Sequence, residues 1–293
     1  MLESLQLPPT VVPSWHDRTQ TTPYVRQLLS VSLNSTPLTP SKGATLHLPR
    51  ILCLHGGGTN SRIFRSQCRA LRARLASYFR LVFAEAPFYT TPGPDVVSVY
   101  ENWGPFRAWL PPGSATGSAS EGPAAISHSP VATKIVLASI EQSIKAAMDQ
   151  DDSAGATGPW TGLLGFSQGA KMAASLLLQQ QNDRRSQDDY RFAVLFAGRA
   201  PMVSLSSLPH NELSLSGFDV GDYGPALHLP TIHVHGLQDP GLPLHRDLLE
   251  NGCRKDSTRL IEWDGDHRVP IRSQDVKAVV DAILDVARET GAI

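Results

Sequence analysis

The chain has 293 residues, a formal net charge of −1 and 41% hydrophobic residues, and its isoelectric point lies near 6.8. The apolar fraction argues against global disorder, and the near-neutral charge argues against bulk electrostatic binding to nucleic acid or to an anionic membrane. The length allows one or two domains, and a single α/β domain often fills it.

Cysteine usage and the N-terminus indicate the compartment. The chain holds 3 cysteines and no C-x-x-C pair, so we expect neither a disulfide framework nor a thiolate zinc site. The first residues lack a basic segment followed by an apolar one, which argues against a secretory signal. No stretch approaches the ~20 apolar residues of a membrane-spanning helix. We therefore expect a cytoplasmic protein that does not bind membranes.

The composition changes along the chain and divides it into an extension and a domain. Residues 1–48 are rich in Pro, Thr and Ser without a sustained period, which predicts an N-terminal extension that need not be ordered. Residues 49–293 contain regular apolar patterns and predict one folded domain. Inside it, residues from about 111 to 130 are mostly Gly, Ser, Ala and Pro, which predicts a flexible insertion.

Within the domain, short apolar runs alternate with segments whose apolar residues recur every three or four positions. The runs predict strands at 51–54, 81–84, 161–166, 192–196, 231–234 and 259–263. The periodic segments predict helices at 62–78, 131–148, 169–180 and 275–290. This alternation is typical of an α/β fold with a mostly parallel central sheet and helices on both faces. The aromatic stretch 87–110 has no clear period and predicts a small cap.

The strongest motif lies between the third strand and its helix. Residues 165–169 read Gly-Phe-Ser-Gln-Gly and match G-x-S-x-G, with an apolar strand before and an apolar helix after. In that context the motif is the nucleophile turn of the α/β-hydrolase fold, with Ser167 as the nucleophile. The alternative is a plain structural turn, because a bare G-x-S-x-G also occurs by chance.

A serine nucleophile needs a base, and the base needs an acid to orient it. In this fold the chain order is Ser, then Asp or Glu, then His. Asp239 follows the fifth strand after a glycine turn, and His267 lies in the loop after the last strand. The carboxyl ends of parallel strands share one edge, so these two and Ser167 are expected to meet there. Asp264 and Asp266 are near His267 in sequence and are rival acids.

Glycines after the first strand predict the rest of an oxyanion hole. Residues 55–58 read His-Gly-Gly-Gly, and a backbone N–H from Gly57 or Gly58 is expected to join that of Gln168 at the developing oxyanion. The run is not a phosphate loop, because no Gly-Lys-Ser/Thr follows it.

Several other side chains have two interpretations. Four aromatic residues are candidates for an apolar substrate pocket, and the alternative for each is packing in the core: Tyr89, Trp103, Phe106 and Trp109. His233 and His235 share one strand face, but no third ligand stands at a convincing spacing, so core histidines are favoured over a metal site. We expect no metal and no cofactor.

Arginines line one face of the first predicted helix. Arg62, Arg65, Arg69 and Arg72 recur away from the apolar positions. A solvated surface is the ordinary interpretation of such a face. The sharper hypothesis is a docking patch for an acidic partner such as an acyl carrier protein.

Taken together, these motifs resemble the fungal serine hydrolase family called FSH. The resemblance covers residues from about 50 to the C-terminus and is carried by these segments: 52–56, 86–87, 109–110, 165–170, 235–239 and 267–270. It is strongest with the branch found in polyketide gene clusters, whose members act as esterases or as stand-alone thioesterases. It implies that the family's nucleophile, acid and base fall on Ser167, Asp239 and His267. Asp266 departs from the family, which often has glycine there.

The leading hypothesis is a serine hydrolase that cleaves an ester or thioester through an acyl-enzyme. The resemblance implies a thioesterase that releases a polyketide from its synthase in fungal secondary metabolism, with the acyl carrier domain of the synthase as partner. A general small-molecule carboxylesterase is the alternative. A catalytically silent ligand-binding protein is a third possibility, although it would not need all three residues of the triad.

Overall fold

The computed structural model describes residues 43, 45–111, 130–183, 189–205 and 226–293. The predicted extension, 1–48, and the predicted insertion, about 111–130, lie almost entirely outside these ranges and stay predictions. Residues 45–48 lie against the loop before the strand β5 (Trp160–Phe166). There the N–H groups of Thr157 and Gly158 donate to the Leu46 carbonyl at 2.7 and 3.1 Å.

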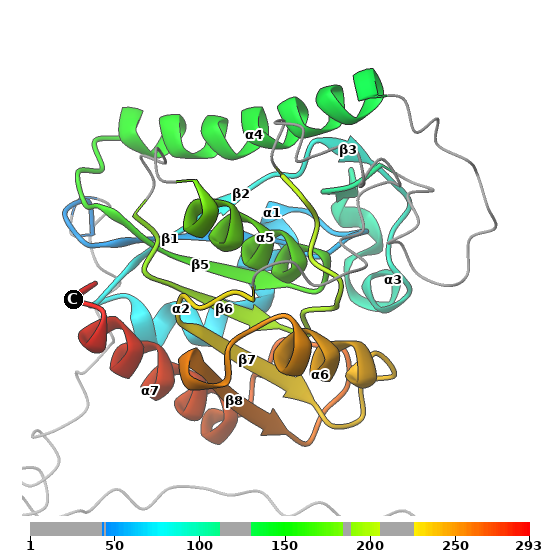
Figure 1. Cartoon of the computed structure of the whole chain (residues 1–293). Helices are drawn as coiled ribbons and strands as arrows, with labels where there is room; N and C mark the ends of the chain where they lie inside the picture. The colour runs from blue at the N-terminus through cyan, green and yellow to red at the C-terminus, as the bar shows by residue number, and fades with distance from the viewer. Residues whose placement is uncertain (1–42, 44, 112–129, 184–188, 206–225) are drawn as a thin grey trace, which may run out of the picture. The chain divides into compact units, whose positions relative to one another are not determined.

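A six-stranded sheet forms the centre of the domain (Figure 1). Its strands are β2 (Arg80–Ala84), β1 (Arg50–Leu54), β5 (Trp160–Phe166), β6 (Phe192–Phe196), β7 (Thr231–Gly236) and β8 (Thr258–Trp263), in that spatial order. Every neighbouring pair is parallel. The parallel sheet confirms the predicted α/β class, and all six predicted strands are present.

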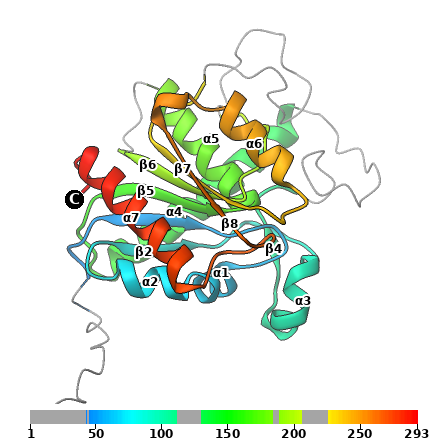
Figure 2. The ribbon, with the colours of Figure 1, turned by 90° about the horizontal axis from the view of Figure 1, so that it is seen from below.

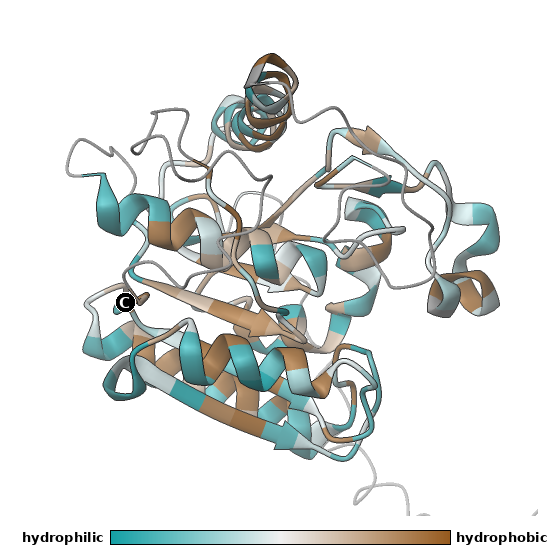
Figure 3. Ribbon diagram, turned by 45° about the vertical axis from the view of Figure 1, so that its right-hand side comes forward, coloured by the Kyte–Doolittle hydropathy of each residue, from teal (hydrophilic) through white to brown (hydrophobic). Residues whose placement is uncertain are grey.

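Helices cover both faces of this sheet (Figure 2). On one face lie α1 (Ser61–Gln67), α2 (Arg69–Leu75) and α7 (Ser273–Glu289), and on the other lie α4 (Pro130–Ser153), α5 (Gln168–Asn182) and α6 (Leu242–Asn251). Successive residues of β1 point to opposite faces, so Ile51 and Cys53 join the core with α7 while Leu52 and Leu54 join the core with α5. Figure 3 shows hydrophobic strands covered by helices with one hydrophobic and one hydrophilic side.

The helix predicted at 62–78 is two helices in the structure. Cys68, with φ −80° and ψ 10°, separates α1 from α2. The Asn60 side chain caps α1 by accepting the N–H of Ile63 at 2.8 Å. Phe64 before the break and Leu71 after it are both fully buried in the same core. Apolar periodicity therefore continues across the break and does not reveal it.

The aromatic stretch forms a small cap. It contains β3 (Phe88–Tyr89), α3 (Pro94–Tyr100), the 3₁₀ helix η2 (Glu101–Trp103) and β4 (Arg107–Ala108). β3 and β4 pair as a short antiparallel hairpin. A β-bridge between Thr59 and Arg107 attaches β4 to the loop after β1, which places the cap at the carboxyl edge of the sheet. Within the described residues, no helix combines the length and the apolar character needed to cross a membrane.

β7 carries two histidines in the core. His233 and His235 are both fully buried, and their ring centroids lie 5.9 Å apart. Burial lowers the pKa of His233 to about 3, with smaller contributions from His235 and His245. Burial likewise lowers the pKa of His235 to about 4. These side chains are therefore neutral members of the core, as the sequence pattern favours.

The low pKa of His233 predicts a loss of stability in acid. In the unfolded chain a histidine has a pKa near 6.5, whereas His233 in the folded protein has a pKa of about 3. Between these two pH values the unfolded state binds a proton at this residue and the folded state does not. The free energy of unfolding should fall through this window by up to about 1.4 kcal/mol per pH unit from this residue. We expect His233→Gln to show a shallower pH dependence than the wild type in urea denaturation.

The control for that measurement is His228→Gln. This histidine is exposed, so the variant should keep the wild-type pH dependence. Identical slopes for the wild type and His233→Gln would contradict the prediction.

Candidate active site

Ser167 lies in the turn between β5 and α5. Its backbone, with φ 53° and ψ −116°, lies in the left-handed half of conformational space, which is costly for a residue other than glycine. A Cβ on Gly165 would collide with the backbone of Gly169, and a Cβ on Gly169 would collide with the Leu54 carbonyl. Only glycine fits on both sides of the serine, which explains the motif. The tight turn that these glycines allow presents the Ser167 hydroxyl above the sheet edge.

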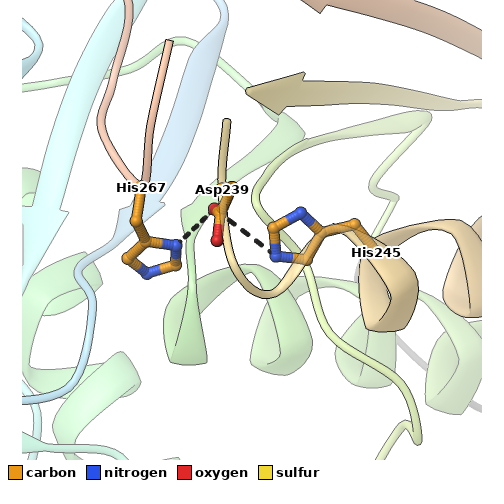
Figure 4. Close-up of side chains that lie close together, drawn as sticks. All are labelled: Asp239, His245 and His267. Carbon is orange, nitrogen blue, oxygen red and sulfur yellow. Dashed lines mark hydrogen bonds and ion pairs between the residues drawn. The ribbon is translucent and has the colours of Figure 1, made fainter. Parts of the chain in front are cut away.

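The structure brings Ser167, His267 and Asp239 into one hydrogen-bonded chain. The Ser167 Oγ lies 3.0 Å from His267 Nε2, and His267 Nδ1 lies 2.6 Å from Asp239 Oδ2. The three residues follow β5, β8 and β7, so the carboxyl edge of the sheet assembles them. Figure 4 shows the His267 and Asp239 side chains pointing toward each other from the two neighbouring loops.

The rival acids face elsewhere. Asp264 accepts a hydrogen bond from the Gln238 amide at 2.6 Å, and Asp266 forms an ion pair with Arg268 at 3.2 Å. Asp247 lies on α6 and accepts a hydrogen bond from the Asn251 side chain at 2.7 Å. Asp239 contacts the His267 ring, and the other three carboxylates have the partners named above.

Asp239 is 4% exposed. Burial by itself would raise the pKa of this carboxyl, but the hydrogen bond and charge of His267 together with the Gly241 N–H outweigh it and lower the pKa. The Gly241 N–H donates to Oδ1 at 2.7 Å. The carboxylate is therefore ionised and keeps the His267 proton on Nδ1, which leaves Nε2 as an acceptor for the serine proton.

The geometry narrows the candidates for the oxyanion hole. The Gly58 N–H already donates to the Arg107 carbonyl at 3.0 Å, so this group is engaged and does not fit the predicted role. The N–H groups of Gly57 and Gln168 donate no hydrogen bond to other described residues. Gln168 begins α5, where the first N–H groups lack partners within the helix. These two donors remain the candidates for an oxyanion.

A hydrogen-bonded bridge joins the nucleophile turn to the glycine loop. The Gln168 carboxamide oxygen accepts the backbone N–H of Trp109 at 2.7 Å. The Trp109 indole N–H donates to the His55 carbonyl at 2.8 Å, and the His55 Nε2 accepts the Ala86 N–H at 3.1 Å. Nothing in the local sequence pattern reveals this bridge, because its partners are 31 to 59 residues apart.

The four predicted pocket aromatics lie in different surroundings. Trp109 is fully buried, so it packs in the core under the glycine loop and does not line an open pocket. Tyr89 is 66% exposed, with the Arg107 guanidinium 4.0 Å from its ring centroid. Trp103 and Phe106 are half-buried in the cap.

His245 is a neighbour of the site that sequence reasoning missed. It lies on α6, is fully buried, and places its Nε2 3.7 Å from Asp239 Oδ2. Burial lowers its pKa to about 3, against the opposing effect of the Asp239 charge. The only sequence signal is its position on the short helix that follows the acid loop.

Comparisons with known proteins show what the chain is similar to. The sequence matches the family described as "Serine hydrolase (FSH1)" over residues 45–279. It is 52% identical over 257 residues to a "Probable esterase" of Aspergillus terreus, covering 83% of this chain and 91% of that one. It is 48% identical over 279 residues to "Esterase pigG" of Monascus ruber, covering 86% and 96%. A solved carboxylesterase of Mesorhizobium loti aligns with 80% of this chain and 88% of its own at 17% identity and a TM-score of 0.47.

The geometry predicts which carboxylate supports the base. Asp239→Asn should lower kcat for ester hydrolysis by about 10³- to 10⁴-fold, because the amide no longer holds the His267 proton on Nδ1. The matched control Asp266→Asn removes a carboxylate beside His267 in sequence but away from its ring, and it should stay within about threefold of the wild type. Equal losses in the two variants, measured with a p-nitrophenyl ester, would contradict the assignment.

Proposed function

The chain belongs to the FSH1 family of serine hydrolases, and from that premise we propose that it cleaves an ester or a thioester through an acyl-enzyme on Ser167. The observation that carries the proposal is the hydrogen-bonded chain from Ser167 through His267 to Asp239. A nucleophile within reach of a base, and a base held by a carboxylate, is the arrangement that acyl transfer requires.

The proposed reaction has two steps. Ser167 Oγ attacks the acyl carbonyl carbon while His267 Nε2 takes its proton, and the Gly57 and Gln168 N–H groups stabilise the oxyanion. The tetrahedral intermediate collapses, the alcohol or thiol leaves with the proton from His267, and the acyl group stays on Ser167. Water then attacks the acyl-enzyme with His267 as base, which releases the acid and restores the serine. An internal hydroxyl in place of water would release a lactone.

For the natural substrate we propose an acyl thioester on a carrier domain of a polyketide synthase. The resemblance to the polyketide-cluster branch supports this choice. The surface of α1 and α2 supports it as well. Residues 61–75 contain 5 arginines, at positions 62, 65, 69, 72 and 74, and no Asp or Glu.

None of these arginines forms an ion pair with a described carboxylate. Instead, the Arg62 guanidinium lies 4.1 Å from the centroid of the Trp103 ring, in the cap beside the site. Arg69 and Arg72 donate only to backbone carbonyls. These unpaired arginines extend from the cap beside the site along α1 and α2. Such a positive surface would attract an acidic carrier domain with a phosphate-bearing arm.

A cytoplasmic location fits this substrate. All three cysteines, Cys53, Cys68 and Cys253, are free and buried, as is usual in a reducing compartment. Burial raises the pKa of the Cys253 thiol to about 12, so this residue is no candidate for a second nucleophile.

A general carboxylesterase is the second candidate, favoured because the similar fungal proteins are named esterases. We expect the wild type to hydrolyse an acyl-N-acetylcysteamine thioester faster than a p-nitrophenyl ester of the same acyl group. Ser167→Ala should lose both activities by about 10⁴-fold or more. Intact mass after a rapid quench should show an acyl adduct on the wild type only.

The control Ser77→Ala changes an exposed serine and should behave as the wild type. Turnover of the ester alone would establish the general esterase in place of the thioesterase. Turnover that survives in Ser167→Ala would overturn the site itself.

The arginine surface makes a separate prediction. The triple variant Arg65→Glu, Arg69→Glu and Arg72→Glu should lower kcat/KM for a carrier-bound thioester by at least about tenfold, since opposite charges steer association. Turnover of the free N-acetylcysteamine thioester should stay unchanged.

A control triple elsewhere on the chain, Lys134→Glu, Lys145→Glu and Arg254→Glu, carries the same change of net charge and should leave both activities intact. If the arginine triple turns over the carrier-bound substrate like the wild type, this surface does not dock the carrier.

A further inference from the structure

The carboxylate of Asp239 lies between two imidazoles. Its Oδ2 is 2.6 Å from His267 Nδ1 and 3.7 Å from His245 Nε2. One carboxylate oxygen and one ring nitrogen of each histidine all lie within 4.8 Å of one another. Figure 4 shows the two rings approaching the carboxylate from opposite sides, one from the loop after β8 and the other from α6.

The His245 ring is an unexplained polar group in the described part of the chain. Its side chain is fully buried, and neither ring nitrogen has a hydrogen-bond partner among the described residues. A buried polar group left without a partner costs about 1–3 kcal/mol, and such a group in a folded protein asks for an explanation. The other polar rings around it are those of His235 and His267, with centroids 5.5 and 6.2 Å away. Its Nε2 faces the negative charge of Asp239, and Arg199 is the side chain of opposite charge that also acts on the ring.

We propose that Asp239, His245 and His267 form a site for a divalent transition metal, Zn²⁺ above all, whose binding reversibly switches the hydrolase off. Two imidazoles and one carboxylate are the donor set of three-ligand zinc sites, with water in the fourth position. Imidazole nitrogen favours Zn²⁺ over Mg²⁺ or Ca²⁺, which prefer oxygen alone. The inhibitory effect rests on the proposed roles of Asp239 and His267 in acyl transfer, but the binding itself does not.

The three ligand atoms are near enough for one ion to draw them together, since all lie within 4.8 Å of one another. Zinc ligands at about 2.0–2.2 Å in a tetrahedron lie roughly 3.4 Å from one another. The separation of 3.7 Å between His245 and Asp239 is close to that spacing. The pair of His267 and Asp239, at 2.6 Å, has to open by less than about 1 Å. The His267 side chain is 20% exposed, so in this proposal the ion and its water enter from solvent along this ring.

Metal binding would leave His267 in place but change which of its ring nitrogens carries the proton. A neutral imidazole carries one ring proton, which lies on Nδ1 while Asp239 accepts it. When the metal takes Nδ1, that proton moves to Nε2, with no net gain or loss of protons. Nε2 then faces the Ser167 hydroxyl at 3.0 Å as a donor and no longer accepts the serine proton. The expected kinetic signature is a fall in kcat, reversed by a chelator.

The test uses two readouts on the full chain. Zn²⁺ should inhibit ester hydrolysis by the wild type at micromolar concentration, and EDTA should restore it. His245→Phe and the more polar His245→Gln, each referred to its own metal-free activity, should need at least about tenfold more Zn²⁺ for half inhibition. Co²⁺ should give the wild type the visible absorption of a tetrahedral site with one ion per chain, and the His245 variants should lack it.

Ser167→Ala separates this inference from the proposed function. It retains all three ligands, so it should bind Co²⁺ like the wild type although it has no turnover. His235→Gln changes the adjacent buried histidine, which is not a ligand, and should keep wild-type zinc sensitivity. The inference is overturned if the His245 variants remain as sensitive to Zn²⁺ as the wild type, or if Co²⁺ shows no stoichiometric tetrahedral absorption with Ser167→Ala.

Discussion

The hydrogen bond between His267 and Asp239 is the interaction on which the site depends, and the pairing of β7 with β8 makes it possible. The two strands run parallel, so their loops leave the sheet side by side. Backbone bonds continue past the strands: the Leu237 N–H donates to the Trp263 carbonyl at 3.0 Å, and the Gln238 N–H donates to the Gly265 carbonyl at 2.9 Å. The proposed acid and base therefore lie on loops that hydrogen bonds join to each other. A buried carboxylate is costly unless it is paired, and the pairing that relieves this cost also orients the base.

The nucleophile depends on a different kind of constraint. Ser167 occupies a strained backbone conformation, which persists only where the surroundings hold it. The two flanking glycines permit that conformation, and the Gln168 carboxamide ties the start of α5 to Trp109 and through it to the glycine loop. Both candidate oxyanion donors, Gly57 and Gln168, belong to this linked unit. Preorganised donors stabilise charge without reorganising during the reaction, so in the proposed mechanism this bridge holds the oxyanion donors in place.

The histidines behind the acid connect the core to the site. His233 and His235 are neutral because they are buried, and His245 extends the same buried group of rings toward Asp239. An imidazole that acts as a general base and one that binds a metal both need an unprotonated ring nitrogen held in a fixed direction. The proposed zinc site therefore shares the proposed acid and base and adds the buried imidazole of His245. His245 distinguishes the two proposals, because the proposed acyl transfer gives it no role and the proposed metal site does.

The sequence alone determined the strands, the chain order of the site residues and the turn that carries Ser167. These features are local: a buried strand, two glycines and a following helix are encoded by residues adjacent in the chain, and parallel strands bring their carboxyl ends to one edge. Only the tertiary structure decided that the Arg107 carbonyl accepts the Gly58 N–H, that Trp109 lies in the core, and that His245 lies beside Asp239. Each of these depends on where a loop or helix crosses another segment. Such crossings are set by packing between distant parts of the chain, which leaves no period or motif in the sequence around any one of the residues involved.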